Sequence, residues 1–469
     1  MLKYLFWHGF FCILGGFKVR KYFGTDGIRR IANTELTPEL VFRVAKAGAC
    51  VLAKHSNHTP TILIGRDTRI SGTLIESAMT AGFLSYGANV KSLGVMPTPA
   101  VAYLTRKLGA DASVVISASH NTYEFNGVKY FSNKGMKISD DMEAEIEEIM
   151  DSDKISELTA VNDKIGVAEI ATDLEDKYIH FFVELFGDYF KNKNFTVGID
   201  TANGATYKIA ERVFTKLGIK YKIINNTPNG ININQNCGST HLDGLKKFVL
   251  DNKLNLGIAY DGDGDRCLAI DEKGNIIDGD MLLAIIAKKL KKDGKLKKDT
   301  IVATVMSNLG LNKYAENNNI QLKQTKVGDR YVLEELLKNG ENFGGEQSGH
   351  IILLDYNPTG DGILTSLMLI QAIQEEGLPA SEVSSIMTAY PQILINAKVN
   401  ANKKHDYEKN DEIRKAITKL EQEFSGNGRV LIRPSGTEPL VRVMIEGKDK
   451  EYITKKAQEL AELIERYLQ

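Results

Sequence analysis

Short apolar runs rich in β-branched residues alternate with longer stretches of helical periodicity along most of the chain. The apolar runs have the length and composition of buried strands and lie at 61–65, 112–116, 195–200, 256–260 and 301–305. Helices are expected at 38–55, 74–86, 141–151, 173–186, 279–290, 330–338, 362–376 and 449–468. This alternation predicts α/β layers. A loop rich in Gly, Ser, Asp or Asn follows each expected strand.

The densest charge cluster is the hexapeptide Asp261-Gly262-Asp263-Gly264-Asp265-Arg266, between two expected strands. Three carboxylates at alternate positions repel one another unless a divalent cation neutralises them, and the glycines let the acids converge. The string nearly fits a calcium loop, with Glu272 at its twelfth position, but Arg266 replaces the glycine and no helices flank it. The pattern therefore favours Mg²⁺ completed by a phosphate oxygen, with a solvated acidic turn as the alternative.

A second polar loop, Ser117-Ala118-Ser119-His120-Asn121, ends the expected strand at 112–116. A Ser-His hydrolase is one interpretation, but neighbouring residues of an extended chain point to opposite sides, which places His120 poorly for the Ser119 proton. A serine that carries a phosphate fits better. Lys129 follows as a candidate charge stabiliser or proton carrier. Taken alone, this loop is also consistent with ordinary polar residues at a strand end.

Two further loops carry groups that suit a sugar phosphate. Glu346, Gln347, Ser348 and His350 offer donors and acceptors for sugar hydroxyls. The segment 433–439 and the arginine beyond it combine charge, hydroxyls and exposed backbone into a phosphate cradle without a Walker motif, with the candidate residues Arg433, Ser435, Gly436, Thr437 and Arg442. Either segment alone could be a surface turn.

Composition limits the choices further. A chain of 469 residues is expected to form three or four domains of roughly 100 to 150 residues. Its 59 basic and 60 acidic side chains give no overall field for nucleic acid or an anionic membrane. The four cysteines lack disulfide or zinc spacing, which favours a reducing cytoplasm.

The first seventeen residues are strongly apolar. The run is too short to cross a bilayer, is interrupted by His8 and glycines, and shows no signal-peptide cleavage pattern. Residues 1–18 are therefore expected to be a non-structural extension, with recognisable domain sequence from Val19.

Taken in order, the four polar loops resemble the four active-site motifs of the α-D-phosphohexomutase superfamily, and the resemblance covers nearly the whole chain after Val19. The segments 23–29 and 232–241 and Gln347 are most similar to the branch that acts on glucosamine phosphates, with the phosphomannomutase/phosphoglucomutase branch as the alternative. The resemblance implies an α/β fold of three similar domains and a smaller C-terminal α+β domain around a central cleft. The expected boundaries are 19–170, 171–272, 273–387 and 388–469.

The resemblance also implies a reaction. Glucosamine 6-phosphate and glucosamine 1-phosphate would interconvert through a phosphoserine at Ser119 and a glucosamine 1,6-bisphosphate intermediate, which also serves as activator. The phosphoserine would hold Mg²⁺ with Asp261, Asp263 and Asp265. Proton handling falls to Lys129 first, then Arg29 and His350, with His120 beside the serine. Substrate binding falls to Arg266, Glu346, Ser348, Arg433, Ser435, Gly436, Thr437 and Arg442.

The resemblance further suggests a homodimer, priming by a kinase or bisphosphate donor, and a place in UDP-N-acetylglucosamine and cell-wall synthesis. Three positions depart from the superfamily pattern: Thr122 replaces a proline, Phe125 an aspartate and Arg30 a glycine. None removes a reacting group. A metal-dependent sugar phosphatase and a non-catalytic sugar-phosphate-binding protein are the alternatives from other classes. The presence of both Ser119 and Lys129 argues against the binding protein.

Overall fold

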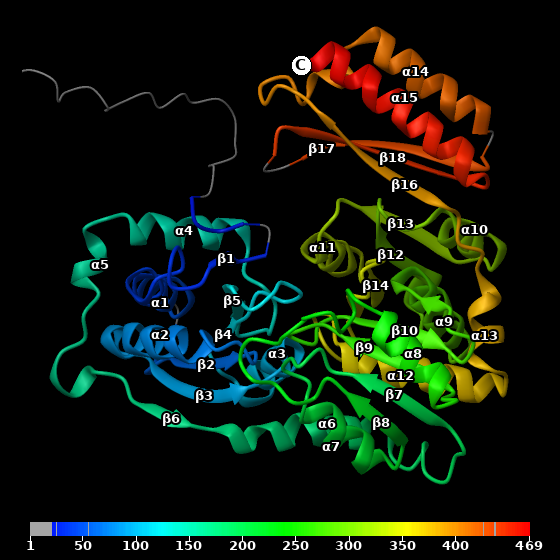
Figure 1. Ribbon diagram of the computed structural model, residues 1–469. Coiled ribbons are helices and arrows are strands. Elements are labelled where there is room, and N and C mark those ends of the chain that lie inside the picture. Colours follow the sequence, from blue (N-terminus) through cyan, green and yellow to red (C-terminus); the bar gives the residue numbers. More distant parts are fainter. Residues whose placement is uncertain (1–20, 25, 55, 425, 436–437) are drawn as a thin grey trace, which may run out of the picture.

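The computed structural model describes residues 21–24, 26–54, 56–424, 426–435 and 438–469 (Figure 1). The expected N-terminal extension lies outside these residues, as do Gly436 and Thr437 of the phosphate cradle. In the described part, four sheets follow one another along the chain, three mixed and one antiparallel. The expectation of three α/β units and a C-terminal α+β unit is confirmed.

The first unit is built on a six-stranded sheet of order β1-β5-β4-β2-β3-β6. Its strands are β1 Ile28–Ile31, β2 Thr61–Arg66, β3 Asn89–Val95, β4 Ala112–Ile116, β5 Phe125–Ser132 and β6 Ala168–Ile170. Its helices are α1 Pro38–Leu52, α2 Gly72–Tyr86, α3 Thr98–Leu108, α4 Asp140–Met150 and the short α5 Lys154–Glu157. Strand β2 pairs in parallel with β3 and β4, whereas β5 runs antiparallel to β4.

The second unit has a five-stranded sheet of order β11-β10-β9-β7-β8. Its strands are β7 Thr196–Asp200, β8 Lys220–Ile224, β9 Leu256–Tyr260, β10 Cys267–Asp271 and β11 Ile276–Ile277, and its helices are α6 Glu175–Phe186, α7 Ile209–Leu217 and α8 Asp243–Asp251. The third unit has the order β13-β12-β14-β15. It contains β12 Thr300–Thr304, β13 Gln321–Thr325, β14 Phe343–Gly345, β15 Ile351–Leu353, α9 Gly279–Lys292, α10 Leu309–Asn317, α11 Asp329–Asn339, α12 Gly362–Glu376 and α13 Ala380–Val383.

One topological pattern recurs in these three units. Three parallel strands, β3-β2-β4, β8-β7-β9 and β13-β12-β14, are each followed by one antiparallel strand, β5, β10 and β15 respectively. The loop into the antiparallel strand therefore occupies the same place in each unit.

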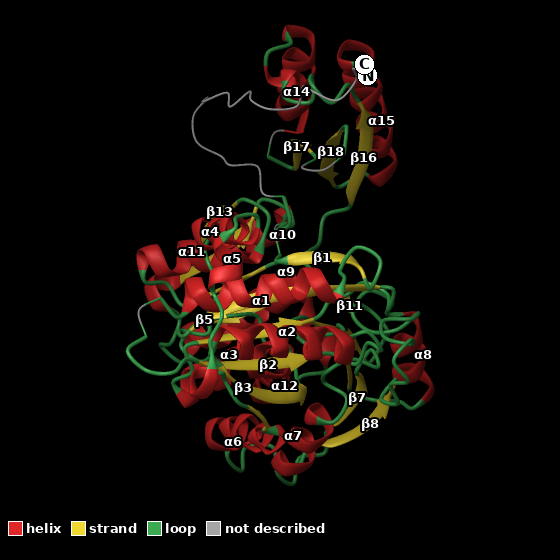
Figure 2. Ribbon diagram, turned by 90° about the vertical axis from the view of Figure 1, so that its left-hand side faces the viewer, coloured by secondary structure: helices red, strands yellow, loops and turns green. Residues whose placement is uncertain are grey.

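The fourth unit is an antiparallel sheet, β16-β18-β17, covered on one face by two helices (Figure 1). It comprises β16 Gln392–Lys398, β17 Gly428–Pro434, β18 Leu440–Gly447, α14 Asp411–Phe424 and α15 Lys450–Leu468. Its apolar core is separate, whereas one continuous core runs through the first three units. Figure 2 shows this unit standing above the rest of the molecule.

Strand periodicity explains how the first sheet joins two cores. Ile62 and Ile64 face the core beneath α1 and α2, and Leu63 faces the core shared with the second and third units. Because successive side chains of a strand point to opposite faces, a continuous apolar run covers both faces of a buried sheet. This is why the apolar runs in the sequence identified these strands.

Helix starts follow local chemistry. Side chains that accept a hydrogen bond from a first-turn backbone N–H cap several helices, namely Thr37, Ser139, Asp278, Asp361 and Asp449. No helix in the described part of the chain is long and apolar enough to cross a membrane.

Candidate active site

Three of the four predicted loops occupy the recurring position. The loop that carries Ser119, called the serine loop below, joins β4 to β5. The loop 261–266, the acidic loop, joins β9 to β10, and the loop 346–350, the sugar loop, joins β14 to β15. Each leaves the carboxyl end of a central parallel strand, which is where open α/β sheets bind ligands. A strand-to-strand turn also excludes the calcium loop, and Glu272 instead accepts hydrogen bonds from Ser381.

Ser119 lies buried at the end of β4, with 1% of its surface exposed. Its Oγ donates a 2.7 Å hydrogen bond to Asp261 Oδ2, and its backbone N–H donates to Ser117 Oγ at 2.9 Å. The backbone is left-handed, with φ 50°. The serine loop of the first unit thus meets the acidic loop of the second.

The left-handed backbone corrects one expectation. Ser119 and His120 do not point to opposite sides, because the chain is not extended there, and Ser119 Oγ lies 3.5 Å from His120 Nδ1. That nitrogen also lies 3.2 Å from Arg266 Nη1, and since a guanidinium can only donate, Nδ1 accepts. Burial and the nearby Arg266 and Arg29 lower the pKa of His120 to about 4. His120 is therefore a neutral acceptor from Arg266, and the serine hydroxyl faces Asp261.

Asp261, Asp263 and Asp265 offer oxygens that all lie within 4.8 Å of one another, and all three residues are buried. Burial and the neighbouring carboxylates of Asp265 and Asp263 raise the pKa of Asp261 well above its ordinary value. The Oδ1 atoms of Asp263 and Asp265 are buried and find no hydrogen-bond partner in the described part of the chain. Crowded carboxylates with unused oxygens fit a hard divalent cation such as Mg²⁺.

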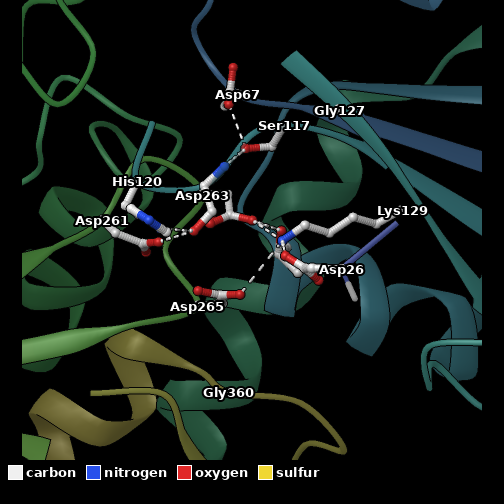
Figure 3. A network of polar contacts seen from close by, with 12 residues as sticks. Asp26, Asp67, Ser117, His120, Gly127, Lys129, Asp261, Asp263, Asp265 and Gly360 are labelled. Carbon is white, nitrogen blue, oxygen red and sulfur yellow. Dashed lines mark hydrogen bonds and ion pairs between the residues drawn. The ribbon is translucent and has the colours of Figure 1, made fainter. Parts of the chain in front are cut away.

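Lys129 on β5 is 2% exposed and faces the same acids (Figure 3). Its Nζ lies 3.0 Å from Asp26 Oδ2, 3.1 Å from Asp263 Oδ2 and 3.9 Å from Asp265 Oδ2. Burial opposes the charge, but these three carboxylates outweigh it and raise the pKa of Lys129 above its ordinary value. The side chain is therefore a buried ammonium ion beside the acidic loop.

Arg29 on β1 reaches the serine loop as well. Its Nη1 donates to Asn121 Oδ1 at 3.0 Å, and its Nη2 donates to Asp26 Oδ2 at 2.8 Å. Arg266 is buried within the acidic loop, and the nearby Asp265 and Asp261 raise its pKa despite burial. Both guanidinium groups contact the loop that carries Ser119, Arg29 through Asn121 and Arg266 through His120.

In the sugar loop, the His350 side chain lies beside Asp265 of the acidic loop. Its Nδ1 lies 3.5 Å from Asp265 Oδ2, and its Nε2 accepts the Gly360 backbone N–H at 3.0 Å. Glu346 Oε1 accepts the Gly328 N–H at 3.1 Å, and burial is the main cause that raises the pKa of Glu346. Ser348 Oγ is buried without a hydrogen-bond partner among the described residues. In the described part of the chain, the sugar loop therefore has one hydroxyl, that of Ser348, free to bind a ligand, whereas His350 contacts the acidic loop.

The fourth loop brings two arginines together. Arg433 on β17 and Arg442 on β18 are directly opposite in the ladder, and burial together with Arg442 lowers the pKa of Arg433. Ser435 Oγ accepts the Glu438 N–H at 3.2 Å. Paired like charges destabilise a sheet unless an anion lies between them. Among the described residues, no hydrogen bond or ion pair joins Arg433, Ser435 or Arg442 to the other three loops.

Sequence reasoning missed several residues of the charge network. Asp26 pairs with Lys129, Arg29 and Lys137, and Lys137 also pairs with Asp329 at the start of α11. Asp329 Oδ2 lies 3.7 Å from His350 Nε2. Asp26 lies in the segment 23–29, which the sequence analysis used only to choose between two branches of the superfamily and not to predict site residues. Neither Lys137 nor Asp329 lies in a motif, so only the fold reveals them.

The family comparisons agree with this site. The chain matches all four domain families described as phosphoglucomutase/phosphomannomutase: alpha/beta/alpha domain I over residues 20–157, domain II over 176–274, domain III over 278–390 and the C-terminal domain over 394–463.

Solved structures share the fold. A phosphoglucomutase/phosphomannomutase family protein from Burkholderia thailandensis has a TM-score of 0.77 at 21% identity, covering 95% of this chain and 97% of that one. An N-acetylphosphoglucosamine mutase from Aspergillus fumigatus, in complex with GlcNAc-6P and magnesium, has a TM-score of 0.69 at 17% identity, covering 96% of each chain.

Sequence relatives are closer. A phosphoglucosamine mutase from Acetivibrio thermocellus is 53% identical over 452 residues, covering 96% of this chain and 99% of the relative. One from Clostridium acetobutylicum is 52% identical over 446 residues, covering 95% of this chain and 99% of the relative. These relatives are mutases and lend no support to the phosphatase alternative. The chain belongs to the phosphoglucosamine mutases, within the phosphoglucomutase/phosphomannomutase family.

Proposed function

We propose that this isomerase interconverts glucosamine 6-phosphate and glucosamine 1-phosphate by carrying the transferred phosphoryl group on Ser119. The observation that carries the proposal is the 2.7 Å contact between Ser119 Oγ and Asp261 Oδ2. It sets a buried hydroxyl at the edge of three convergent acids. A phosphate on this oxygen would lie beside both the acids and the arginine of the same loop.

The reaction consists of two transfers that balance each other. In the first, the sugar O1 forms a bond to phosphorus as the bond from phosphorus to Ser119 Oγ breaks, and the hydroxyl proton leaves the sugar while the serine oxygen regains one. This gives the 1,6-bisphosphate. After the intermediate turns, Ser119 Oγ forms a bond to the phosphorus carried by O6 as the bond from that phosphorus to O6 breaks. The serine hydroxyl loses its proton, O6 takes one up, and glucosamine 1-phosphate is left. Positioning and charge stabilisation supply most of the catalysis in such transfers.

Asp261, Asp263 and Asp265 would hold Mg²⁺ together with an oxygen of the phosphoserine. The unused Oδ1 atoms of Asp263 and Asp265 support this assignment. When bound, the ion would neutralise charge on the transferring group. Arg266 complements it from the same loop.

Lys129 is our first choice for proton handling. Its ammonium group lies within 3.1 Å of Asp263 Oδ2 on the side of the acidic loop that faces Asp26. From there it would stabilise the serine oxygen as the phosphoryl group leaves and give it a proton. Arg29 and His350 remain secondary candidates for this role.

The sugar loop would select the amino sugar. Gln347 Nε2 lies 3.4 Å from Asp278 Oδ2, and because a carboxylate only accepts hydrogen bonds, this contact leaves Gln347 Oε1 as an acceptor. A glucosamine ammonium group would suit that oxygen and the nearby Asp278. Glu346 and Ser348 would bind sugar hydroxyls.

Arg433, Ser435 and Arg442, with Gly436 and Thr437, would hold the phosphate that is not reacting. The facing guanidinium groups of Arg433 and Arg442 support an anion between them. One cradle would serve both orientations of the bisphosphate, since it binds a phosphate whichever end of the sugar reacts.

The reaction also requires a source of the first phosphate. Ser119 needs a first phosphate from a kinase or from glucosamine 1,6-bisphosphate. A homodimer and a place in UDP-N-acetylglucosamine synthesis are proposed from the family alone. A cytoplasmic location is supported by Cys50, Cys237 and Cys267, which form no disulfide with one another in the described part of the chain.

The test is a mutase assay on glucosamine, glucose and mannose phosphates side by side, with inorganic phosphate measured in the same samples. Isomerisation of glucosamine phosphate with the highest kcat/KM supports the proposal. A higher kcat/KM for a neutral sugar phosphate would contradict the substrate assignment.

A further inference from the structure

The asparagine-rich segment 232–241 identifies the branch but has no role so far in the site. Within it, Asn234 is 2% exposed. Its Nδ2 donates to the backbone oxygens of Ser119 and Asn121, both at 2.8 Å. Because both partners are acceptors, the amide nitrogen must face them. A residue of the second unit therefore binds the serine loop of the first.

Arg69, which follows β2, reaches the same two oxygens. Its Nη2 donates to Ser119 O at 3.1 Å and to Asn121 O at 2.7 Å, and its Nε donates to Phe125 O at 2.9 Å. The residue is 1% exposed. Two NH₂ groups thus make four hydrogen bonds to two carbonyl oxygens, which uses both lone pairs of each oxygen.

The serine loop needs such support. Ser119 has φ 50°, a conformation that residues other than glycine hold only when their surroundings enforce it. Thr122 follows Asn121, and no proline lies between Ser117 and Phe125 to stiffen the loop. The four hydrogen bonds from Asn234 and Arg69 end on backbone oxygens, so they do not depend on which side chains the serine loop carries.

The acidic loop packs onto the same place. A Cβ atom at Gly262 would lie 2.5 Å from Ser119 O and 2.8 Å from Asn234 Nδ2. The backbone N–H of Asn234 donates to Ala202 O at 2.9 Å, which anchors it in the second unit. Asn234 therefore links the acidic loop and the serine loop.

We propose that Asn234, together with Arg69, is a positioning residue that holds Ser119 in the geometry for phosphoryl transfer. The second unit thereby controls the conformation of the nucleophile loop in the first. The inference rests on the proposed covalent role of Ser119. Misplacement of a reacting group by about 1 Å can cost about 100-fold in rate.

The test compares Asn234→Ala with Asn236→Ala. Asn236 is exposed and has nearly the same left-handed backbone, φ 53° against 57°, so its replacement imposes the same backbone strain away from the serine loop. Both proteins are phosphorylated on Ser119, and the transfer to glucosamine 6-phosphate is followed in a single turnover by intact mass. Asn234→Ala should transfer about 10- to 100-fold more slowly than Asn236→Ala with KM nearly unchanged. Its backbone amides over 117–125 should also exchange hydrogen faster.

Equal transfer rates in the two variants would overturn the proposal, as would unchanged hydrogen exchange over 117–125. Arg69→Lys gives a second test that does not depend on the stability of Asn234→Ala, because lysine keeps the charge but lacks the planar guanidinium group whose Nε and Nη2 reach three separate carbonyl oxygens. Its transfer rate should fall similarly, and the double variant should lose less than the product of the single losses. If the wild type carries no phosphate on Ser119, the proposed function itself is refuted. If the wild type is phosphorylated and Asn234→Ala transfers its phosphate equally fast, only the positioning role is refuted.

Discussion

Lys129 Nζ lies 3.0 Å from Asp26 Oδ2, which lies outside the acidic loop. Asp26 also pairs with Lys137, which itself pairs with Asp329 of the third unit. A chain of charges thus runs from the third unit to the buried ammonium group. Asp26 therefore helps to set where Lys129 lies relative to Ser119.

Replacing Asp26 with Asn should lower kcat at least about tenfold, because Lys129 loses one of its flanking carboxylates and shifts toward the acidic loop. KM for glucosamine 6-phosphate should change less. Steady-state kinetics measure both. Asp151→Asn is the control, since its carboxylate pairs with Lys21 at 2.9 Å on the surface and should leave both constants unchanged. A variant of Asp26 with wild-type kcat would contradict this account.

Asp263→Asn should weaken Mg²⁺ binding and turnover together, with partial recovery at high Mg²⁺. The variant removes one ligand charge with little change in shape. Thermal melting gives a readout without catalysis: Mg²⁺ should raise the melting temperature of the wild type more than that of the variant, because a ligand that binds only the folded state stabilises it. Identical shifts in both proteins would favour a solvated acidic turn.

Gln347→Ala should reduce the preference for the amino sugar. Gln347 Oε1 is the acceptor left over by the contact with Asp278, so its loss removes a partner of the ammonium group. We expect kcat/KM to fall by about tenfold for glucosamine 6-phosphate, near the effect of one charged hydrogen bond. The value for glucose 6-phosphate should change much less. An equal fall for both sugars would show that Gln347 does not read the amine.

Arg429 ties the fourth unit to the third. Its guanidinium donates to the backbone oxygens of Val305 at 3.1 Å and Ser307 at 2.8 Å, and it pairs with Glu446. Arg429→Ala should raise KM by about tenfold with a smaller change in kcat, because the phosphate cradle lies on the same strand and loses its anchor. Arg466→Ala, on the exposed side of α15, is the control. An unchanged KM would argue against a coupling of these two units through Arg429.

The sequence predicted the buried strands β2, β4, β7, β9 and β12, because continuous apolar runs mark buried strands and chemistry gathers at their ends. Strands with more exposed or polar positions, such as β8 and β13, gave no such run. Ser119, the three acids and Lys129 do converge as expected. The left-handed backbone of Ser119 could not be foreseen, since a non-glycine residue gives no local sign of it. Asn234 and Lys137 act across domain boundaries, and no periodicity or motif in one segment reports a contact with another.

The most direct test of the central claim is intact-mass and peptide analysis of the protein after incubation with glucosamine 1,6-bisphosphate and Mg²⁺. The account predicts one added phosphate, located on Ser119, that passes to glucosamine 6-phosphate when the sugar is added. Ser119→Ala should stay unmodified, keep a folded melting transition and lose mutase activity. Mutase turnover by Ser119→Ala, or an added phosphate on another residue that passes to the sugar, would contradict the account.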